Sequence, residues 1–137
     1  MIQRVSFPFE KRPSPLFDSV YRPAVLVSFW SRKITCWVDV VALVDTGADY
    51  TLLPYTYANA LGIDVMREGQ GFATQGIGGS ERVHLVRRWK FKLGQWMREI
   101  PLGFIHRDDV PPLLGRQGCL EAFKLTLFRR RTSFSLR

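Results

Sequence analysis

The sequence of 137 residues predicts a mostly-β fold, a barrel or sandwich with one or two short helices. Three observations lead to this prediction. Short runs of β-branched and aromatic residues recur along the chain, glycine and proline turn signals separate them, and strand and helix patterns do not alternate. A chain of this length fits one domain, which can bury a core without disulfides or a metal.

Residues 1–20 are predicted to form an irregular N-terminal arm, and residues 21–137 a single domain. Pro8, Pro13 and Pro15 lie in the arm. Because proline disfavours helices and interrupts strand ladders, no regular element is expected there.

Two strands are expected next, over residues 24–30 and 34–44, because both runs are rich in β-branched and aromatic side chains. A helix is predicted over residues 55–61. Pro54 would occupy its first position and Gly62 would cap its C-terminus.

A hairpin with a mobile tip is expected at the glycine-rich segment that follows. Its second strand continues through residues 83–93, where apolar residues alternate with basic ones, the pattern of a strand with one solvated face. The glycines of the segment are Gly69, Gly71, Gly76, Gly78 and Gly79.

The C-terminal third predicts a strand over residues 96–104, a short apolar run at Leu113-Leu114 and two helical turns over residues 117–123. Two short strands, 124–128 and 132–136, would then form a hairpin around three consecutive arginines, Arg129, Arg130 and Arg131.

The net charge of +8 could attract nucleic acid, an anionic membrane surface or acidic proteins. The basic residues gather in segments 82–92 and 129–131, which we interpret as solvated strand faces and a turn. A basic β-domain that binds nucleic acid stays an alternative on charge alone. Because the aromatic-and-basic signature of such modules is missing, nucleic acid is not the expected partner.

No stretch approaches the roughly 18 apolar residues that a membrane helix needs, so no membrane span is expected. The N-terminus also lacks the continuous apolar core of a signal peptide, which makes a cytoplasmic location the default expectation.

The metal-ligating residue types are few and scattered. Cys36 and Cys119 are too few for a disulfide framework, and each is expected to pack as a small buried apolar residue. His84 and His106 have no cysteine or carboxylate at metal-ligand spacing and are expected at the surface. We therefore expect no metal and no cofactor.

Asp45 is the candidate catalytic residue. It follows three apolar residues at the end of a predicted strand, which is an unusual place for an acid, and Gly47 permits a tight turn with a close backbone approach. Thr46 supplies a hydroxyl that can lock this turn. The segment is compatible either with a positioned acid or base or with an ordinary turn between strands.

Three segments, in this order, resemble the retropepsins, the retroviral-type aspartic proteases with cellular and bacterial relatives. Residues 44–49, Val-Asp-Thr-Gly-Ala-Asp, are similar to the catalytic loop of the family. Residues 76–79, Gly-Ile-Gly-Gly, are similar to the tip of its flap, and residues 113–116, Leu-Leu-Gly-Arg, to the segment before its C-terminal helix. The resemblance implies a closed acid-protease barrel with a flap hairpin.

The resemblance also implies an aspartic endopeptidase that acts on peptide or protein substrates as a homodimer. One chain carries a single Asp-Thr-Gly, so two copies of Asp45 would have to meet on a two-fold axis. Asp45, Thr46 and Gly47 would form the catalytic loop, with Thr46 bonding across the axis. The alternative is a retropepsin-like dimerisation or peptide-binding module with little or no proteolysis.

Further roles follow from the resemblance alone. Asp49 and Arg116 would form an ion pair within the subunit, and the hairpin of residues 123–136 would help to seal the dimer. Tyr50 departs from the small or acidic residue common in viral enzymes. The substrate-binding residues implied by the resemblance are Ala48, Asp49, Gly76, Ile77, Gly78, Gly79, Leu113 and Leu114.

Overall fold

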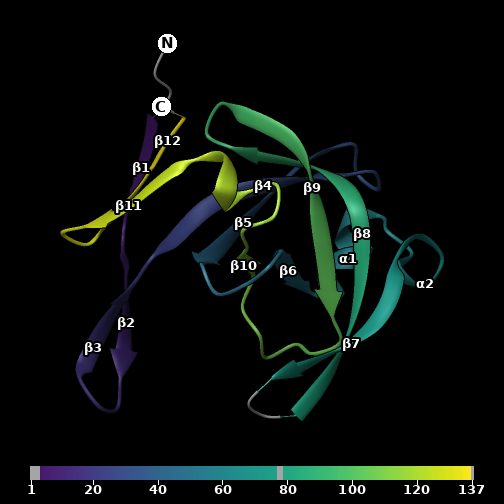
Figure 1. Cartoon of the computed structure of the whole chain (residues 1–137), viewed down its shortest axis with the longest axis horizontal. Coiled ribbons are helices and arrows are strands. Elements are labelled where there is room, and N and C mark those ends of the chain that lie inside the picture. Colours follow the sequence, from purple (N-terminus) through teal and green to yellow (C-terminus); the bar gives the residue numbers. More distant parts are fainter. Residues whose placement is uncertain (1–3, 77–78, 137) are drawn as a thin grey trace.

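The computed structural model describes residues 4–76 and 79–136 and confirms a mostly-β fold with two short α-helices (Figure 1). Apart from these helices, only a single 3₁₀ turn, η1 (Leu120–Ala122), is helical in the described residues. The helices are α1 (Thr56–Leu61) and α2 (Val65–Glu68). The strands are β1 (Arg4–Pro8), β2 (Glu10–Ser14), β3 (Asp18–Arg22), β4 (Ala24–Ser31), β5 (Cys36–Val44), β6 (Thr51–Pro54), β7 (Gln70–Gly76), β8 (Gly79–Leu93), β9 (Trp96–Ile105), β10 (Leu113–Leu114), β11 (Lys124–Phe128) and β12 (Arg131–Ser135).

The main sheet has seven strands in the order β4-β5-β10-β6-β9-β8-β7. β8 also pairs with β4, which bends the sheet into a barrel-like ring that is not formally closed, in place of the fully closed barrel expected. Most neighbours are antiparallel, but β10 runs parallel to β5 and β6 runs parallel to β9. The β5–β10 pairing places the end of β5 beside β10, away from the edges of the sheet.

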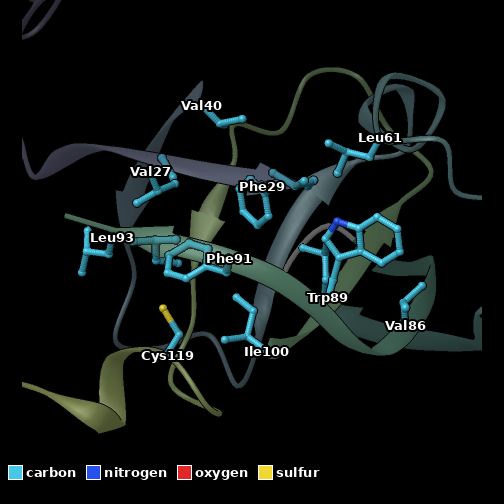
Figure 2. Packing of buried hydrophobic residues seen from close by; sticks show 14 of the residues in the cluster. Val27, Phe29, Val40, Leu61, Val86, Trp89, Phe91, Leu93, Ile100 and Cys119 are labelled. Atoms are coloured by element: carbon cyan, nitrogen blue, oxygen red, sulfur yellow. The ribbon is translucent and has the colours of Figure 1, made fainter. Parts of the chain in front are cut away.

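The core fills the inside of this ring, where alternate residues of β4, β5, β8 and β9 meet (Figure 2). Phe29, Phe91 and Ile100 have no exposed surface. The indole of the buried Trp89 has a hydrogen-bond partner, because its Nε1–H donates to the Trp30 carbonyl at 2.8 Å. The expected alternation in β8 shifts phase at a bulge between Val86 and Trp89.

The sequence predicted an irregular N-terminal arm, but the described part of this region forms the strands β1, β2 and β3. β1 is an edge strand of a three-stranded sheet with β12 and β11, and β2 pairs with β3 alone as a projecting hairpin (Figure 1). Proline is tolerated on such edges, because its missing N–H can face away from the ladder. Pro8 ends β1 and Pro13 lies in β2, so both prolines occupy edge strands.

The two helical predictions are partly correct. Gly62 caps α1 with φ 75°, as expected, but Pro54 lies in β6 and not in the first turn of the helix. The turns predicted for residues 117–123 shrink to the single 3₁₀ turn η1. None of the helices in the described part of the chain is long and apolar enough to cross a membrane.

The glycine-rich segment forms the expected hairpin of β7 and β8, which pair in continuous register from Gln70↔Leu85 to Gly76↔Gly79. Ile77 and Gly78 lie outside the described residues. The C-terminal hairpin is also present, with Arg129 and Arg130 at its turn in the left-handed region.

Two side-chain predictions were wrong. Cys119 is buried as expected, but Cys36 is exposed, because it begins β5 at the rim of the barrel; both thiols are free. His84 is not at the surface but only 5% exposed, since the glycine-rich strand β7 covers it, whereas His106 is exposed.

Candidate active site

Asp45 follows β5 directly, and two backbone hydrogen bonds fix this end of the strand. The Leu43 N–H donates to the Pro112 carbonyl at 2.9 Å, and the Asp45 N–H donates to the Leu114 carbonyl at 3.0 Å. β10 thereby continues its parallel ladder past the end of β5. The backbone of the acid is therefore held by the sheet, while its side chain leaves the core.

The turn after Asp45 brings backbone donors back to the acid. The Gly47 N–H donates to Asp45 Oδ1 at 2.9 Å, and the Ala48 N–H donates to the Asp45 carbonyl at 3.1 Å. A Cβ on residue 47 would lie 3.2 Å from Asp45 Oδ1, closer than most such contacts. The glycine thus allows the close approach that the sequence predicted.

Thr46 was expected to lock this turn through its hydroxyl. Within residues 4–76 and 79–136 that hydroxyl makes no hydrogen bond, and Thr46 is exposed in the single chain. Arg116 holds the turn instead, because its Nη1 donates to the Thr46 carbonyl at 2.6 Å. This contact could not be predicted from residue types, because its acceptor is a backbone carbonyl.

Arg116 also forms the ion pair that the resemblance implied. Its Nη2 lies 2.6 Å from Asp49 Oδ1, and its backbone N–H donates to the Ala48 carbonyl at 3.0 Å. One planar guanidinium thus holds the segment at two points, which suits the fork of an arginine. Asp49 is therefore tied to the loop that carries Asp45.

Gly115 and Thr51 complete the support beneath the loop. A Cβ at position 115 would lie 2.2 Å from the Tyr50 backbone, so only glycine fits this crossing. The Gly115 N–H donates to Thr51 Oγ1 at 3.2 Å inside the protein. Cys119 is buried, and burial raises the pKa of its thiol to about 12. That cysteine is inert at neutral pH.

Tyr50 connects the loop of Asp45 to the β7–β8 hairpin. Its ring meets Phe72 of β7 edge to face, with ring centroids 6.0 Å apart. Burial, and then the charge of Asp49, raise the pKa of Tyr50, which keeps its hydroxyl neutral. The sequence marked Tyr50 as a departure from viral enzymes, but the contact with Phe72 depends on the fold and was not foreseen.

The predicted substrate residues are only partly available. Leu113 is half-buried and keeps some surface, whereas Leu114 has none and belongs to the core, because successive residues of β10 face opposite ways. Leu114 is therefore no substrate contact, and this prediction is corrected. Gly76 and Gly79 pair across the end of the hairpin.

The chemical group that the site offers is the carboxylate of Asp45, which can accept and donate a proton. In the described part of the chain, no group of three or more His, Cys, Asp or Glu side chains could hold a metal ion. Asp45 is half-buried, and Thr46 and Gly47 are exposed. In a single chain this part of the loop is therefore accessible to solvent. A hollow of about 350 Å³ adjoins the strand that carries Asp45, and its walls include Arg22, Leu43 and Pro112.

The comparisons with known proteins agree with this geometry. Residues 38–117 match the model of the family described as "gag-polyprotein putative aspartyl protease". No curated protein is similar enough in sequence to be matched to the chain.

Among solved structures, the chain is similar to a retropepsin-like aspartic protease from Rickettsia conorii, with a TM-score of 0.66 and 17% identity over 98% of this chain and 92% of that one. It is also similar to EIAV protease in complex with the inhibitor HBY-793, with a TM-score of 0.51 and 21% identity over 69% of this chain and 82% of that one. At these identities the two structures support the fold, and the matched family segment contains the whole Asp45 loop, residues 44–49.

Proposed function

The chain belongs to the retropepsin-like aspartyl protease family, and from that premise we propose that it is an aspartic endopeptidase whose active site forms between two copies of the chain. The observation that carries the proposal is the Asp45 loop. A single carboxylate is held at the end of the half-buried strand β5 by backbone bonds, and the face of its loop is left open.

One carboxylate does not suffice for this chemistry, because peptide hydrolysis by water needs a base for the water and an acid for the leaving group. The described chain places no second acid beside Asp45 in any hydrogen bond or ion pair. A two-fold axis next to the loop would supply the partner's copy of the same residue. The open face of Thr46 and Gly47 is consistent with such an axis.

In the proposed dimer the two carboxylates share one proton, as is known for aspartic proteases in general. The ionised carboxylate removes a proton from the attacking water. The protonated one hydrogen-bonds the carbonyl of the scissile peptide and then helps to protonate the leaving nitrogen. No metal or organic cofactor takes part in these steps.

The fold supports this role by keeping the acid in place. The Gly47 N–H binds Oδ1 and Arg116 holds the Thr46 carbonyl, so the carboxylate is positioned before substrate arrives. Ala48 occupies a position where pepsin-like relatives often carry serine, and it offers no side-chain donor to the carboxylate. We therefore expect an optimum in mild acid, at about pH 4–6.

Substrates are proposed to be peptides or unfolded protein segments with apolar side chains near the cut. Leu113 and the hollow beside Leu43 provide apolar surface close to the strand that carries Asp45. Arg12 and Arg22 line the same hollow together with Glu10, so positive charge exceeds negative charge there and an acidic residue in the substrate would also be accepted.

The test is cleavage of a mixed peptide library by the wild-type chain and by Asp45→Asn, with and without a transition-state inhibitor of aspartic proteases. Cleavage that the inhibitor blocks and the variant lacks supports the proposal. Equal cleavage by Asp45→Asn contradicts it. If neither chain cleaves from pH 3 to 7 but a dimer forms, the fold serves as a dimerisation or peptide-binding module.

A further inference from the structure

His84 is a buried titratable residue that the proposed reaction does not use. It lies on β8 opposite Gly71 of β7, within the hairpin, and is only 5% exposed. A Cβ on Gly71 would come within 3.0 Å of His84 Nε2, so the glycine makes room for the imidazole ring. The ring is therefore enclosed by the neighbouring strand of its own hairpin.

The other ring nitrogen of His84 leaves the hairpin. His84 Nδ1 lies 2.8 Å from Nε2 of His106, which follows β9. The His106 ring in turn stacks on Tyr55 at the start of α1, with centroids 5.5 Å apart and planes at 6°. This one hydrogen bond thus links the side chains of the hairpin to the segment after β9 and to α1.

A network of solvent-exposed ion pairs joins the same two segments. Arg107 binds Glu81 on β8 at 2.8 Å and Asp109 at 2.5 Å. All three side chains are at least 30% exposed, so this network contributes little under screening. The backbone of β8 is joined to the same segment as well, because the His106 N–H donates to the Arg82 carbonyl at 3.1 Å, next to the β8–β9 pairing of Val83 with Ile105. The histidine pair is therefore the protected side-chain link between the hairpin and this segment.

The number of protons on the pair decides whether the link can exist. With no added proton, one ring donates N–H and the other accepts. A proton added to His106 keeps the bond, because His106 then donates to His84 Nδ1. When both rings are protonated, two N–H groups and two positive charges face each other, and the bond is lost.

The surroundings of His84 lower the pH at which the pair takes up its second proton. Burial is the largest cause that lowers the pKa of His84, followed by the charges of His106 and Arg82. The nearby carboxylates, Glu81 and Asp109, are already bound by Arg107. On the neighbouring helix α2, Glu68 is bound by Arg32. The bond therefore survives to more acidic pH than an isolated histidine would allow.

We propose that His84 and His106 are positioning residues whose side-chain hydrogen bond stabilises β7 and the base of the β7–β8 hairpin while at most one of them is protonated, and that this stabilisation is lost in acid although β8 stays paired with β9. The consequence for catalysis rests on the proposed function. Because Phe72 of the same hairpin packs on Tyr50 beside the catalytic loop, loss of this hydrogen bond weakens substrate binding on the acid side of the pH profile.

Two variants of the exposed partner separate this role from a merely structural one. In His106→Gln the amide can donate to neutral His84 or accept from protonated His84, so the link persists at every pH. In His106→Ala the link is absent at every pH. Both changes lie outside the core, and both leave His84 in its place beneath Gly71.

The first measurement, amide exchange, does not require catalytic activity. In an Asp45→Asn background, backbone amide exchange in β7, corrected for its intrinsic pH dependence, is compared at pH 7 and pH 4. NMR follows the two histidines of the chain through the same range. Wild-type protection should fall on the order of fivefold in acid, as expected for the loss of one ordinary hydrogen bond. His106→Ala should show the low value at both pH values, and His106→Gln the high value at both.

The second readout is the Michaelis constant of the active chain. KM should rise in acid for the wild type, stay low for His106→Gln and be high throughout for His106→Ala, with kcat changed less. Protection in β7 that is the same in all three chains would overturn the proposal. If no cleavage is found, the proposed function fails, yet the exchange measurement still decides whether the histidine pair holds the hairpin.

Discussion

Replacement of Arg116 by alanine should destabilise the chain more than neutralisation of its acidic partner. Arg116 makes two side-chain contacts of 2.6 Å, one to the Thr46 carbonyl and one to Asp49. Arg116→Ala removes both. Asp49→Asn removes only the charge of the second and leaves an amide oxygen that can still accept.

The magnitudes follow from the environment of each contact. A hydrogen bond from a charged donor contributes about 1.5–3 kcal/mol, and the lower end applies because the Arg116 side chain is 39% exposed. The ion pair contributes about 0.2–1 kcal/mol, since the Asp49 side chain is 77% exposed. Arg116→Ala should therefore cost about 2 kcal/mol, or roughly 6–8 °C in Tm, and Asp49→Asn less than about 1 kcal/mol.

The assay is thermal and urea unfolding of both variants at one fixed protein concentration, because dimer formation would make stability depend on concentration. Arg88→Ala is the matched control. Arg88 is exposed on β8 and its side chain has no hydrogen bond or ion pair to the described residues, so its loss should change Tm little. If Asp49→Asn were as damaging as Arg116→Ala, the Thr46 carbonyl would not be the main target of the guanidinium, and the reasoning would be refuted.

Three further outcomes are expected. Gly115→Ala should cost at least about 3 kcal/mol of unfolding free energy, since its Cβ would meet the Tyr50 backbone at 2.2 Å; a variant with wild-type Tm would contradict this. In the native protein a thiol reagent such as dithionitrobenzoate should modify Cys36 only, because burial raises the pKa of Cys119 to about 12; denaturant should expose the second thiol. The lowered pKa of His84 means that the folded chain binds protons less readily than the unfolded chain. Its contribution to stability is therefore present above about pH 6.5 and lost as the pH falls through the folded pKa, which urea unfolding across this range would detect.

The sequence predicted those parts of the fold that local patterns determine. The strands around Asp45, the β7–β8 hairpin and the Gly62 cap all follow from residue type and spacing. The strands of the N-terminal region could not be predicted in this way. Their prolines argue against strand ladders, and only the edge positions of β1 and β2 in the finished sheets make them acceptable.

In the candidate site, too, only the features that depend on local sequence could be predicted. The Asp45 loop and the Arg116 partner of Asp49 could be proposed from the sequence, whereas the bond from Arg116 to the Thr46 carbonyl depends on the path of the backbone. Burial of Leu114 and the pairing of His84 with His106 depend on contacts between distant strands. A one-dimensional pattern does not say which of two adjacent leucines faces the core.

The central claim is that the active site exists only where two chains meet, and a mixing experiment tests it most directly. Wild-type chain is titrated with Asp45→Asn at constant total concentration, after subunits have been allowed to exchange, and the cleavage rate per wild-type chain is measured. A mixed dimer has one Asp45 and should be inactive, so at equal amounts the rate per wild-type chain should fall to about half. A rate that stays unchanged as Asp45→Asn is added, under conditions where mixed dimers are detected, would contradict the account.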